Sequence, residues 1–219
     1  MARTIHLDYF TDILCVWAYA SQARLDEIVK HHGDRIEVRH HFIPVFGDML
    51  HRLESKWADR GGRDGFADHL HGVAGKFPHV EVHPDLGRTF MPVSSAPAHL
   101  FLKAVQQSCE AAAFERCAWE VRVAWFRDNR EIHRMPVLFE IAKEAALPVE
   151  GIRERIHSGE AMAAVCRDGE LQREMGIEGS PTWVLNEGRQ KLYGNVGYRI
   201  VEANVIELLE QPEGGASWC

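Results

Sequence analysis

The stretch DILCVWAY, residues Asp12–Tyr19, decides how the rest of the chain is interpreted. It follows a short apolar segment, Ile5–Phe10, whose alternation predicts a β-strand, and it leads into a helical pattern that ends near Val29. Cys15 therefore stands where a strand gives way to a helix, at the positive end of the helix dipole. Unpaired backbone N–H groups at that position stabilise a thiolate, so we expect Cys15 to have a lowered pKa and to be nucleophilic at neutral pH.

A second motif, Gly-Ser-Pro-Thr, stands late in the chain at residues 179–182. Its proline opens an apolar strand at Thr182–Leu185, which is followed by an Asn-Glu-Gly turn and a return strand at Gln190–Tyr193. A helical pattern follows at Tyr198–Glu210. An early reactive cysteine together with a late X-Pro turn is the arrangement of a thioredoxin-like fold.

Residues 15–19, Cys-Val-Trp-Ala-Tyr, resemble the Cys-Pro-Trp-Cys-Tyr site of the DsbA-like thioredoxin family. They are also similar to the Ser-Pro-Tyr-Ser-Tyr type of site in kappa-class glutathione transferases and 2-hydroxychromene-2-carboxylate isomerases. The resemblance covers nearly the whole chain, in the segments Ile5–Tyr19, Arg39–Gly47, Met91–His99, Phe126–Leu147 and Met175–Gly194. It implies an α/β, thioredoxin-like fold and an oxidoreductase, transferase or isomerase activity.

The periodic patterns divide the chain into a β-α-β unit, an all-helical insertion and a β-β-α unit, with the second strand at Arg35–Ile43. We expect a thioredoxin-like domain formed by residues 1–47 and 176–212, a helical insertion domain at 48–175 and a flexible tail at 213–219. Within the insertion, the patterns predict short helical pieces between Asp48 and Gly72, an irregular loop at Lys76–Met91, and helices at Ser94–Cys109, Ala111–Asp128, Met135–Ala146, Val149–His157 and Ala161–Met175.

The composition is that of a globular protein with a sizeable core: 219 residues, 46% of them hydrophobic. No apolar run approaches the roughly 20 residues of a membrane span, and a net charge of −7 argues against a nucleic-acid partner. Residues 1–6 lack the apolar region of a signal peptide. The five cysteines, an odd number, fit a reducing compartment better than a disulfide framework, so we expect a cytoplasmic protein.

Ala18 limits the chemistry of the site. A dithiol site needs a resolving cysteine three residues after the first, and Ala18 carries only a methyl group there. The sequence therefore predicts monothiol chemistry at Cys15, in which a small thiol such as glutathione resolves a mixed disulfide. Trp17 either shields the sulfur or packs in the core, and the Tyr19 hydroxyl either reaches a substrate or belongs to an ordinary packing residue.

The Ser180-Pro181 pair resembles the cis-proline motif of the family, and only the resemblance implies a cis bond, because such bonds are uncommon. In that motif the backbone N–H and C=O of Ser180 lie near the thiol and pair with a cysteinyl backbone like a short strand. Cys15 is then the expected catalytic residue. The expected substrate- or glutathione-binding residues are Trp17, Tyr19, Ser180, Pro181 and Thr182.

Two further stretches resemble the transferases and isomerases. His41–Gly47 is similar to their Arg-Pro-Phe-Leu-Leu-Gly stretch after the second strand, and Pro92–His99 to their Asn-Ser/Thr-Leu-x-Ala-His/Arg helix start. Two features depart from those enzymes. They usually carry Ser where Cys15 stands, and the Gly-Ser/Gln-Asp-Arg run that holds the glutamyl end of glutathione is Gly-Asn-Val-Gly at residues 194–197.

No metal site is predicted, because no Cys-x-x-Cys pair exists and the adjacent His40 and His41 point apart on a strand. Cys109 and Cys117 lie in helical patterns and are interpreted as structural, whereas Cys219 stands on the Gly-Gly tail. No tightly bound cofactor is expected, and glutathione is considered only as a co-substrate.

Our first hypothesis is a thiol-dependent protein-disulfide oxidoreductase that acts on a thiol or disulfide substrate, with the insertion and the Lys76–Met91 loop covering the site. The alternative is a glutathione-dependent transferase or isomerase of the kappa or 2-hydroxychromene-2-carboxylate isomerase type, acting on a small aromatic molecule. A third hypothesis is a binding protein that has lost its chemistry, for which Ala18 is the main hint. Nucleic-acid and membrane partners are not expected, and a homodimer is expected by analogy alone.

Overall fold

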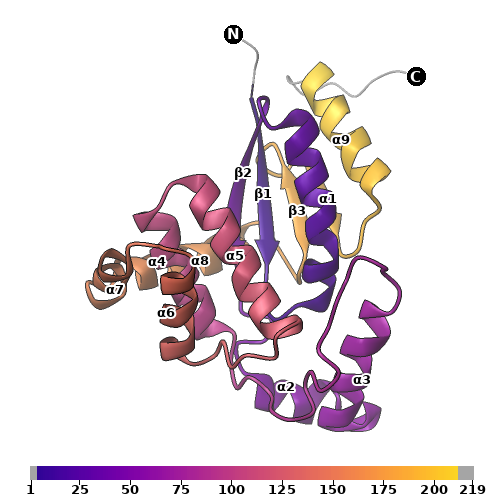
Figure 1. Cartoon of the computed structure of the whole chain (residues 1–219). Coiled ribbons are helices and arrows are strands. Elements are labelled where there is room, and N and C mark those ends of the chain that lie inside the picture. The colour runs from indigo at the N-terminus through magenta and orange to yellow at the C-terminus, as the bar shows by residue number, and fades with distance from the viewer. Residues whose placement is uncertain (1–3, 212–219) are drawn as a thin grey trace.

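The computed structural model describes residues 4–211. Within them the chain forms one mixed sheet in the order β2-β1-β3-β4 (Figure 1). The strands are β1 (Ile5–Thr11), β2 (Ile36–Phe42), β3 (Thr182–Leu185) and β4 (Gln190–Tyr193). β2 runs parallel to β1, whereas β3 runs antiparallel to both β1 and β4. This is the thioredoxin-like β-α-β and β-β-α arrangement that the sequence predicts.

All regular elements described between β2 and β3 are helices, which confirms the predicted helical insertion. α1 (Val16–His32) connects β1 to β2, and α9 (Tyr198–Glu210) follows β4. The insertion contains α2 (Met49–Lys56), the short 3₁₀ helix η1 (Ala58–Arg60), α3 (Gly62–Ala74), α4 (Ala96–Ser108), α5 (Ala111–Phe126), α6 (Met135–Glu144), α7 (Val149–His157) and α8 (Glu160–Glu174).

One hydrophobic core lies between the sheet and the pair α1 and α9, which run side by side (Figure 1). β1 contributes Ile5, Leu7 and Tyr9, the alternating positions that the sequence pattern singles out. Its remaining positions are also buried, except for the half-buried His6, because β1 has a neighbour on each side and protein on both faces. The central strand of the sheet is therefore apolar at most positions.

A second and larger core lies between the insertion and the C-terminal end of β1. Figure 1 shows the insertion gathered around the end of the sheet toward which the β1 arrow points. This core contains Ile13, Leu14 and Cys15 from the β1–α1 junction, together with buried residues of α4 and α5 such as Phe101 and Phe126. Cys15 thus lies where the thioredoxin-like elements meet the insertion.

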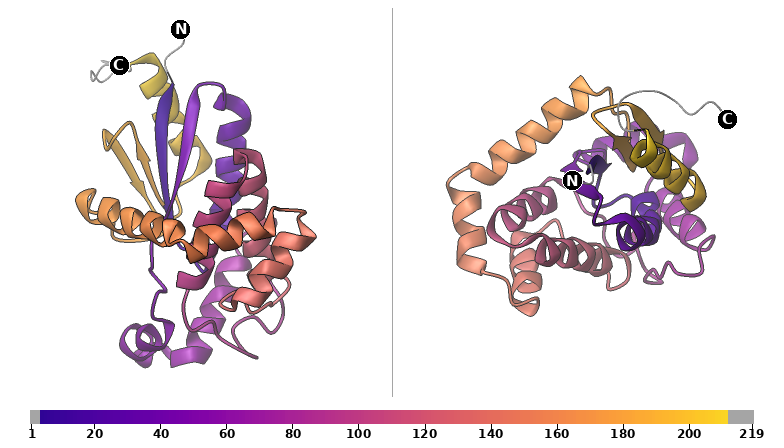
Figure 2. Two further views of the ribbon diagram at one scale, coloured as in Figure 1. Left: turned by 90° about the vertical axis from the view of Figure 1, so that its left-hand side faces the viewer. Right: turned by 90° about the horizontal axis from the view of Figure 1, so that it is seen from above.

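A series of charged side chains in contact with one another connects the insertion to the edge strand β2. The Nζ of Lys103 lies 2.8 Å from Oδ2 of Asp168, and Oδ1 of Asp168 lies 3.0 Å from Nδ1 of His41. The Nε2 of His41 lies 2.8 Å from Oδ1 of Asp8, and the Phe42 N–H donates to Asp168 at 2.7 Å. These contacts hold α4 and α8 against the end of β2, where α8 crosses the sheet (Figure 2).

The element boundaries agree closely with the sequence patterns. The helices α7 and α9 and the strands β3 and β4 span the predicted residues, and α1 starts at Val16, directly after Cys15. Residues 75–95 contain no helix or strand, in agreement with the predicted irregular loop. The tail predicted at 213–219 lies outside the described residues. Among residues 4–211, no helix is both long enough and apolar enough to cross a membrane.

Candidate active site

Cys15 occupies the N-cap position of α1 and is only 4% exposed. Its backbone N–H donates to the carbonyl oxygen of Asp12 at 3.1 Å and so closes the turn that joins β1 to α1. Its thiol donates to the carbonyl oxygen of Ser180 at 3.2 Å. The fold therefore brings together the two motifs that the sequence analysis singles out, the early cysteine and the late Ser-Pro pair.

Asp12 organises the turn that presents Cys15. Its carboxylate is fully buried and accepts the backbone N–H of Leu14 at 2.9 Å, the N–H of Phe46 at 2.8 Å and the hydroxyl of Ser95 at 2.8 Å. Burial raises the pKa of Asp12, but the nearby His99 ring and these backbone N–H groups outweigh it, and the pKa is lowered. Asp12 is therefore an ionised group that ties the junction to the insertion.

The loop before β3 carries Ser180 and Pro181, which are joined by a cis peptide bond. The Ser180 hydroxyl accepts the backbone N–H of Asp12 at 2.8 Å and lies 3.5 Å from the hydroxyl of Thr11. These contacts leave the Ser180 carbonyl directed at the Cys15 thiol. The two sides of the site are thus linked through both backbone and side chains.

Thr182 and residues 194–197 lie next to the cis proline. The Thr182 hydroxyl donates to the carbonyl of Gly179 at 2.7 Å and is buried, so this side chain faces its own loop. The Gly194 N–H donates to the carbonyl of Pro181 at 2.8 Å. The segment 194–197 therefore lies beside the cis proline, where Asn195 is an exposed polar residue.

Tyr19 is a packing residue in this structure. Its ring stacks on Phe126, with centroids 4.5 Å apart, and on Trp119 at 5.3 Å. Its hydroxyl donates to the carbonyl of Glu81 at 3.1 Å, which fastens the irregular loop to α1, and burial raises the pKa of Tyr19. Of the two roles that the sequence leaves open for Tyr19, the observed contacts are those of packing.

Trp17 lies half-buried on the side of α1 that faces α3 and the irregular loop. Its ring centroid lies 6.2 Å from that of His69 and 6.3 Å from that of Phe77, and the Nζ of Lys76 lies 5.8 Å from the Trp17 ring. Trp17 is thus the partly exposed aromatic residue two positions after Cys15. Its neighbours come from the part of the insertion that we expected to cover the site.

The sequence predicts a lowered pKa for Cys15, but in the structure the pKa of Cys15 is raised. Burial raises the pKa of the Cys15 thiol above its ordinary value, while contacts with the Ser180 side chain and the Ala18 backbone N–H act in the opposite direction. A thiolate in a water-poor environment is destabilised relative to the thiol, and here that effect is the larger one. The helix N-terminus alone therefore does not lower the pKa of the buried Cys15 thiol.

The described cysteines do not supply a partner for Cys15. Ala18 is fully buried one helical turn along α1, and Cys15, Cys109 and Cys117 are free. Cys117 lies in the insertion core, where burial raises its pKa to about 12. Cys166 is also free, and exposed, whereas Cys219 lies outside the described residues. No metal-binding group of His, Cys, Asp and Glu occurs within residues 4–211.

The sequence analysis did not single out Arg122, a buried arginine of α5 that reaches this site. It is 3% exposed, and its guanidinium donates to the Thr11 hydroxyl at 2.7 Å and to the carbonyl of Asp12 at 3.4 Å. A signal was available, because Arg122 interrupts the apolar run of α5 between Val121 and Val123. A charged residue in such a run is buried only with polar partners, and here these come from the β1–α1 junction.

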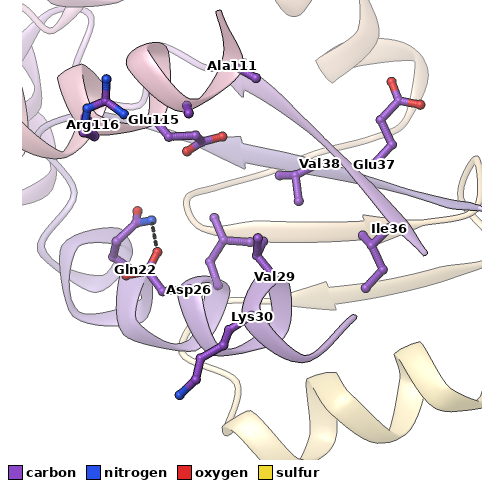
Figure 3. A pocket seen from close by; sticks show the side chains of 12 residues that line it. Gln22, Asp26, Val29, Lys30, Ile36, Glu37, Val38, Ala111, Glu115 and Arg116 are labelled. Atoms are coloured by element: carbon purple, nitrogen blue, oxygen red, sulfur yellow. Dashed lines mark hydrogen bonds between the residues drawn. The ribbon is translucent and has the colours of Figure 1, made fainter. Parts of the chain in front are cut away.

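A groove of about 680 Å³ lies away from this site, between α1, β2 and α5 (Figure 3). Its apolar lining includes Leu25, Val29, Ile36 and Val38, with charged side chains around them. Neither Cys15 nor the Ser-Pro loop lines the groove. The groove contains no cysteine and is separate from the Cys15 site.

The chain resembles known proteins in both sequence and fold. The model of the DSBA-like thioredoxin domain matches residues 6–205. Among curated proteins, the ClpXP adapter protein SpxH of Bacillus licheniformis is 33% identical over 124 residues, a match that covers 52% of this chain and 40% of that relative. The chain therefore matches less than half the length of this relative.

Solved structures show the same fold at low sequence identity. The cytosolic disulfide reductase DsbM from Pseudomonas aeruginosa has a TM-score of 0.69 and 22% identity, covering 92% of this chain and 98% of that chain. A structure of DsbM with GSH is also similar, with a TM-score of 0.67, 20% identity and coverage of 92% and 99%. A 2-hydroxychromene-2-carboxylate isomerase has a TM-score of 0.65 and 16% identity, covering 94% and 97%.

Proposed function

The chain belongs to the DSBA-like thioredoxin domain family, and from this premise we propose that it is a thiol-dependent oxidoreductase with Cys15 as its nucleophile. The observation that carries the proposal is the 3.2 Å contact between the Cys15 sulfur and the Ser180 carbonyl. Backbone groups beside a nucleophile can hold an extended substrate in the manner of an added strand. Ser180 and Pro181 present such a backbone, and Trp17 lines the approach to it.

The proposed reaction is a series of thiol–disulfide exchanges. The Cys15 thiolate attacks one sulfur of a substrate disulfide, so that a Cys15–substrate disulfide forms and the other sulfur leaves as a thiolate that takes up a proton. A small thiol then displaces the bound substrate as a second thiol, and another molecule of the small thiol releases Cys15. The substrate disulfide is reduced to two thiols, and two small thiols are oxidised to one disulfide. A thiol from outside the protein is needed because Ala18 has no sulfur with which to form an internal disulfide.

The reaction needs an opened form of the site, because Cys15 is 4% exposed and burial raises its pKa. The segment that opens is the irregular loop at 75–95, which is fastened to α1 through the Tyr19–Glu81 hydrogen bond and the Trp17–Phe77 contact. When this loop moves away, water reaches the sulfur and the desolvation that favours the thiol is removed. The helix N-terminus then favours the thiolate.

Glutathione is the small thiol that we propose as co-substrate, and the cytoplasm is the proposed compartment. The odd cysteine count supports a reducing compartment, in which glutathione is abundant. The solved structure of the cytosolic disulfide reductase DsbM with GSH is of a protein with the same fold. In this chain the surface for the glutathione backbone is Ser180, and Asn195 is the exposed polar residue of the 194–197 segment.

The second candidate function is a glutathione-dependent transferase or isomerase on a small aromatic substrate. The hydrogen bond from the Gly194 N–H to the Pro181 carbonyl favours it, because it places the segment that corresponds to the glutathione-binding run of those enzymes beside the cis proline. The segment lacks the polar Ser/Gln-Asp-Arg groups of that run. In that case Cys15 orients or activates glutathione and forms no disulfide. The aromatic groups around Trp17, including His69 and Phe77, then line the place of the second substrate.

The deciding experiment measures alkylation of Cys15 across pH, with and without glutathione, and identifies the modified peptide by mass spectrometry. Cys15→Ser is the control for labelling at other cysteines. A Cys15–glutathione disulfide formed from oxidised glutathione, together with reduction of a peptide disulfide, supports the oxidoreductase. Protection of Cys15 by glutathione without any disulfide supports the transferase or isomerase. A thiol that titrates near its ordinary value of about 8.5 and ignores glutathione contradicts both.

A further inference from the structure

Arg122 connects the insertion to both sides of the Cys15 site. One guanidinium nitrogen donates to the carbonyl of Asp12, the same oxygen that accepts the Cys15 backbone N–H. The other donates at 2.7 Å to the Thr11 hydroxyl, which lies 3.5 Å from the Ser180 hydroxyl. A single side chain from α5 therefore contacts the turn that carries the nucleophile and, through Thr11, the loop that carries the Ser180 carbonyl.

The positive charge of Arg122 has no ion-pair partner among residues 4–211. No described carboxylate oxygen lies within 4.0 Å of its nitrogens, although the side chain is 3% exposed. Asp12, the nearest acid in sequence to these contacts, directs its carboxylate to Leu14, Phe46 and Ser95 instead. A buried cation without a contacting anion is costly, and an anion that forms beside it during function would offset this cost, in addition to the more distant negative charges of Asp12 and Glu115.

The anion that the proposed reaction forms at this place is the Cys15 thiolate. Burial lowers the pKa of Arg122, whereas the acidic groups of Tyr9, Cys15, Asp12 and Glu115 raise it, so Cys15 is among the groups that interact with this charge. The same interaction lowers the pKa of Cys15, against the larger effect of burial and against the negative charge of Asp12, both of which raise it. With Ala18 in place of a second cysteine, no neighbouring thiol donates a hydrogen bond to the sulfur.

We propose that Arg122 is a positioning residue of the Cys15 site: it supplies the positive charge that balances the Cys15 thiolate, and through Thr11 it holds the loop whose Ser180 carbonyl faces the sulfur. This inference rests on the proposed function, because it assigns Arg122 a role in forming the reactive thiolate. Arg122 does not contact the substrate. It acts through its charge, which lies at the Asp12 carbonyl of the turn that carries Cys15, and through the geometry of the loop.

The test compares Arg122→Gln, Arg122→Lys and the unchanged protein in the pH dependence of Cys15 alkylation by iodoacetamide. Arg122→Gln is expected to raise the apparent Cys15 pKa by about one unit, which lowers the alkylation rate at neutral pH about tenfold. Arg122→Lys keeps the charge, and its rate is expected to lie closer to that of the unchanged protein. Arg116→Gln is the matched control, since it removes an exposed charge from the same helix and is expected to leave the rate unchanged.

A structural role alone gives a different result. In that case both Arg122 variants lower the thermal unfolding temperature, but the apparent pKa of Cys15 in the folded protein stays the same, and the inference is overturned. If Arg122→Gln fails to fold, Arg122→Lys tests the role of the charge and Thr11→Val tests the role in the loop. An Arg122→Lys protein whose apparent Cys15 pKa lies a full unit or more above that of the unchanged protein contradicts the role of the charge. Thr11→Val with unchanged Ser180 contacts contradicts the role in the loop.

The proposed function is tested separately, on the same samples, by mixed-disulfide formation with oxidised glutathione. If the unchanged protein forms no mixed disulfide and yet Arg122→Gln shifts the Cys15 pKa, the oxidoreductase proposal fails while Arg122 keeps its role. If the mixed disulfide forms and Arg122→Gln leaves the pKa unchanged, only the inference about Arg122 fails.

Discussion

The sulfur of Cys15 lies 3.2 Å from the carbonyl oxygen of Ser180, although the two residues are 165 positions apart in the chain. The sheet produces this contact, because β1 delivers Cys15 at its C-terminal end and the antiparallel β3 begins beside that end. Asp12 and Thr11 then hold the Ser180 side chain in place. The Cys15 thiol is therefore positioned by the sheet and covered by the insertion.

Ala18→Cys is expected to convert the monothiol site into a dithiol site. Ala18 lies one helical turn after Cys15, at the spacing of a Cys-x-x-Cys pair, and its methyl group is fully buried. The added thiol can expel a bound substrate by forming an internal disulfide, so the two thiols of the protein supply both electrons of the first turnover, and two small thiols are needed only afterwards to reduce the internal disulfide. Single-turnover assays without glutathione measure how much substrate thiol is released. Ala18→Ser, which has a similar size and no sulfur, is the control and should release no substrate.

Tyr19→Phe is expected to accelerate alkylation of Cys15. The change keeps the ring stack on Phe126 but removes the hydrogen bond to the Glu81 carbonyl that fastens the irregular loop. Such a bond contributes about 1 kcal/mol, which corresponds to about a fivefold larger open population. The alkylation rate at constant pH measures this effect. An unchanged rate would show that this hydrogen bond does not control access to the thiol.

Asp12→Asn is expected to lower the free energy of unfolding by about 2–4 kcal/mol. The carboxylate accepts hydrogen bonds on both oxygens, and the amide of Asn would place its own donor against either the Leu14 or the Phe46 N–H. Urea denaturation measures the loss. Asp48→Asn is the matched control, because the exposed Asp48 accepts only the His51 N–H at the start of α2 and should cost about 1 kcal/mol or less.

The pH dependence of this contribution follows from the lowered pKa of Asp12 in the folded chain. The unfolded chain has the ordinary value of 3.8, so the stabilisation is present above that pH and is lost as the pH falls through the lower folded pKa. Asp12→Asn should therefore remove part of the acid sensitivity of folding. A stability curve between pH 2 and pH 6 that has the same slope in the variant contradicts the assignment.

Much of the fold could be predicted from the sequence because its signals are local. Alternation in Ile5–Phe10, the Ser-Pro pair before β3 and the apolar stripe of α5 each depend on nearby residues alone, and all three elements form as expected. The pairing of Cys15 with Ser180 could be predicted only through the family resemblance, because nothing local links positions that far apart.

The electrostatics of the site could not be predicted in the same way. The helix N-terminus argued for a lowered Cys15 pKa, but the insertion buries the sulfur, and burial depends on long-range packing that the motif does not encode. Arg122 and Asp12 were missed for the same reason. Each is one charged residue in an apolar stretch, and its role appears only when α5 and the β1–α1 junction are brought into contact.

The last prediction concerns His41, which lies between two buried carboxylates at the edge of the sheet. Its ring nitrogens lie 2.8 Å from Asp8 and 3.0 Å from Asp168. Burial lowers the pKa of His41, but the hydrogen bonds to Asp168 and Asp8 outweigh it even with Lys103 nearby, and the pKa is raised above 6.5. The imidazolium therefore stabilises the fold fully below pH 6.5, and this stabilisation is lost as the pH rises through the folded pKa.

His41→Gln should remove this dependence. The unchanged protein is expected to lose free energy of unfolding as the pH rises above about 6.5, whereas the variant should be less stable at low pH and show a flatter curve through that range. Urea denaturation at half-unit steps between pH 5.5 and pH 9 measures both curves. His51→Gln, at an exposed position of α2, is the control and should keep the slope of the unchanged protein. Parallel curves for His41→Gln and the unchanged protein would mean that His41 is neutral between its two carboxylates, and that the insertion is held to β2 by Lys103 and Asp168 without it.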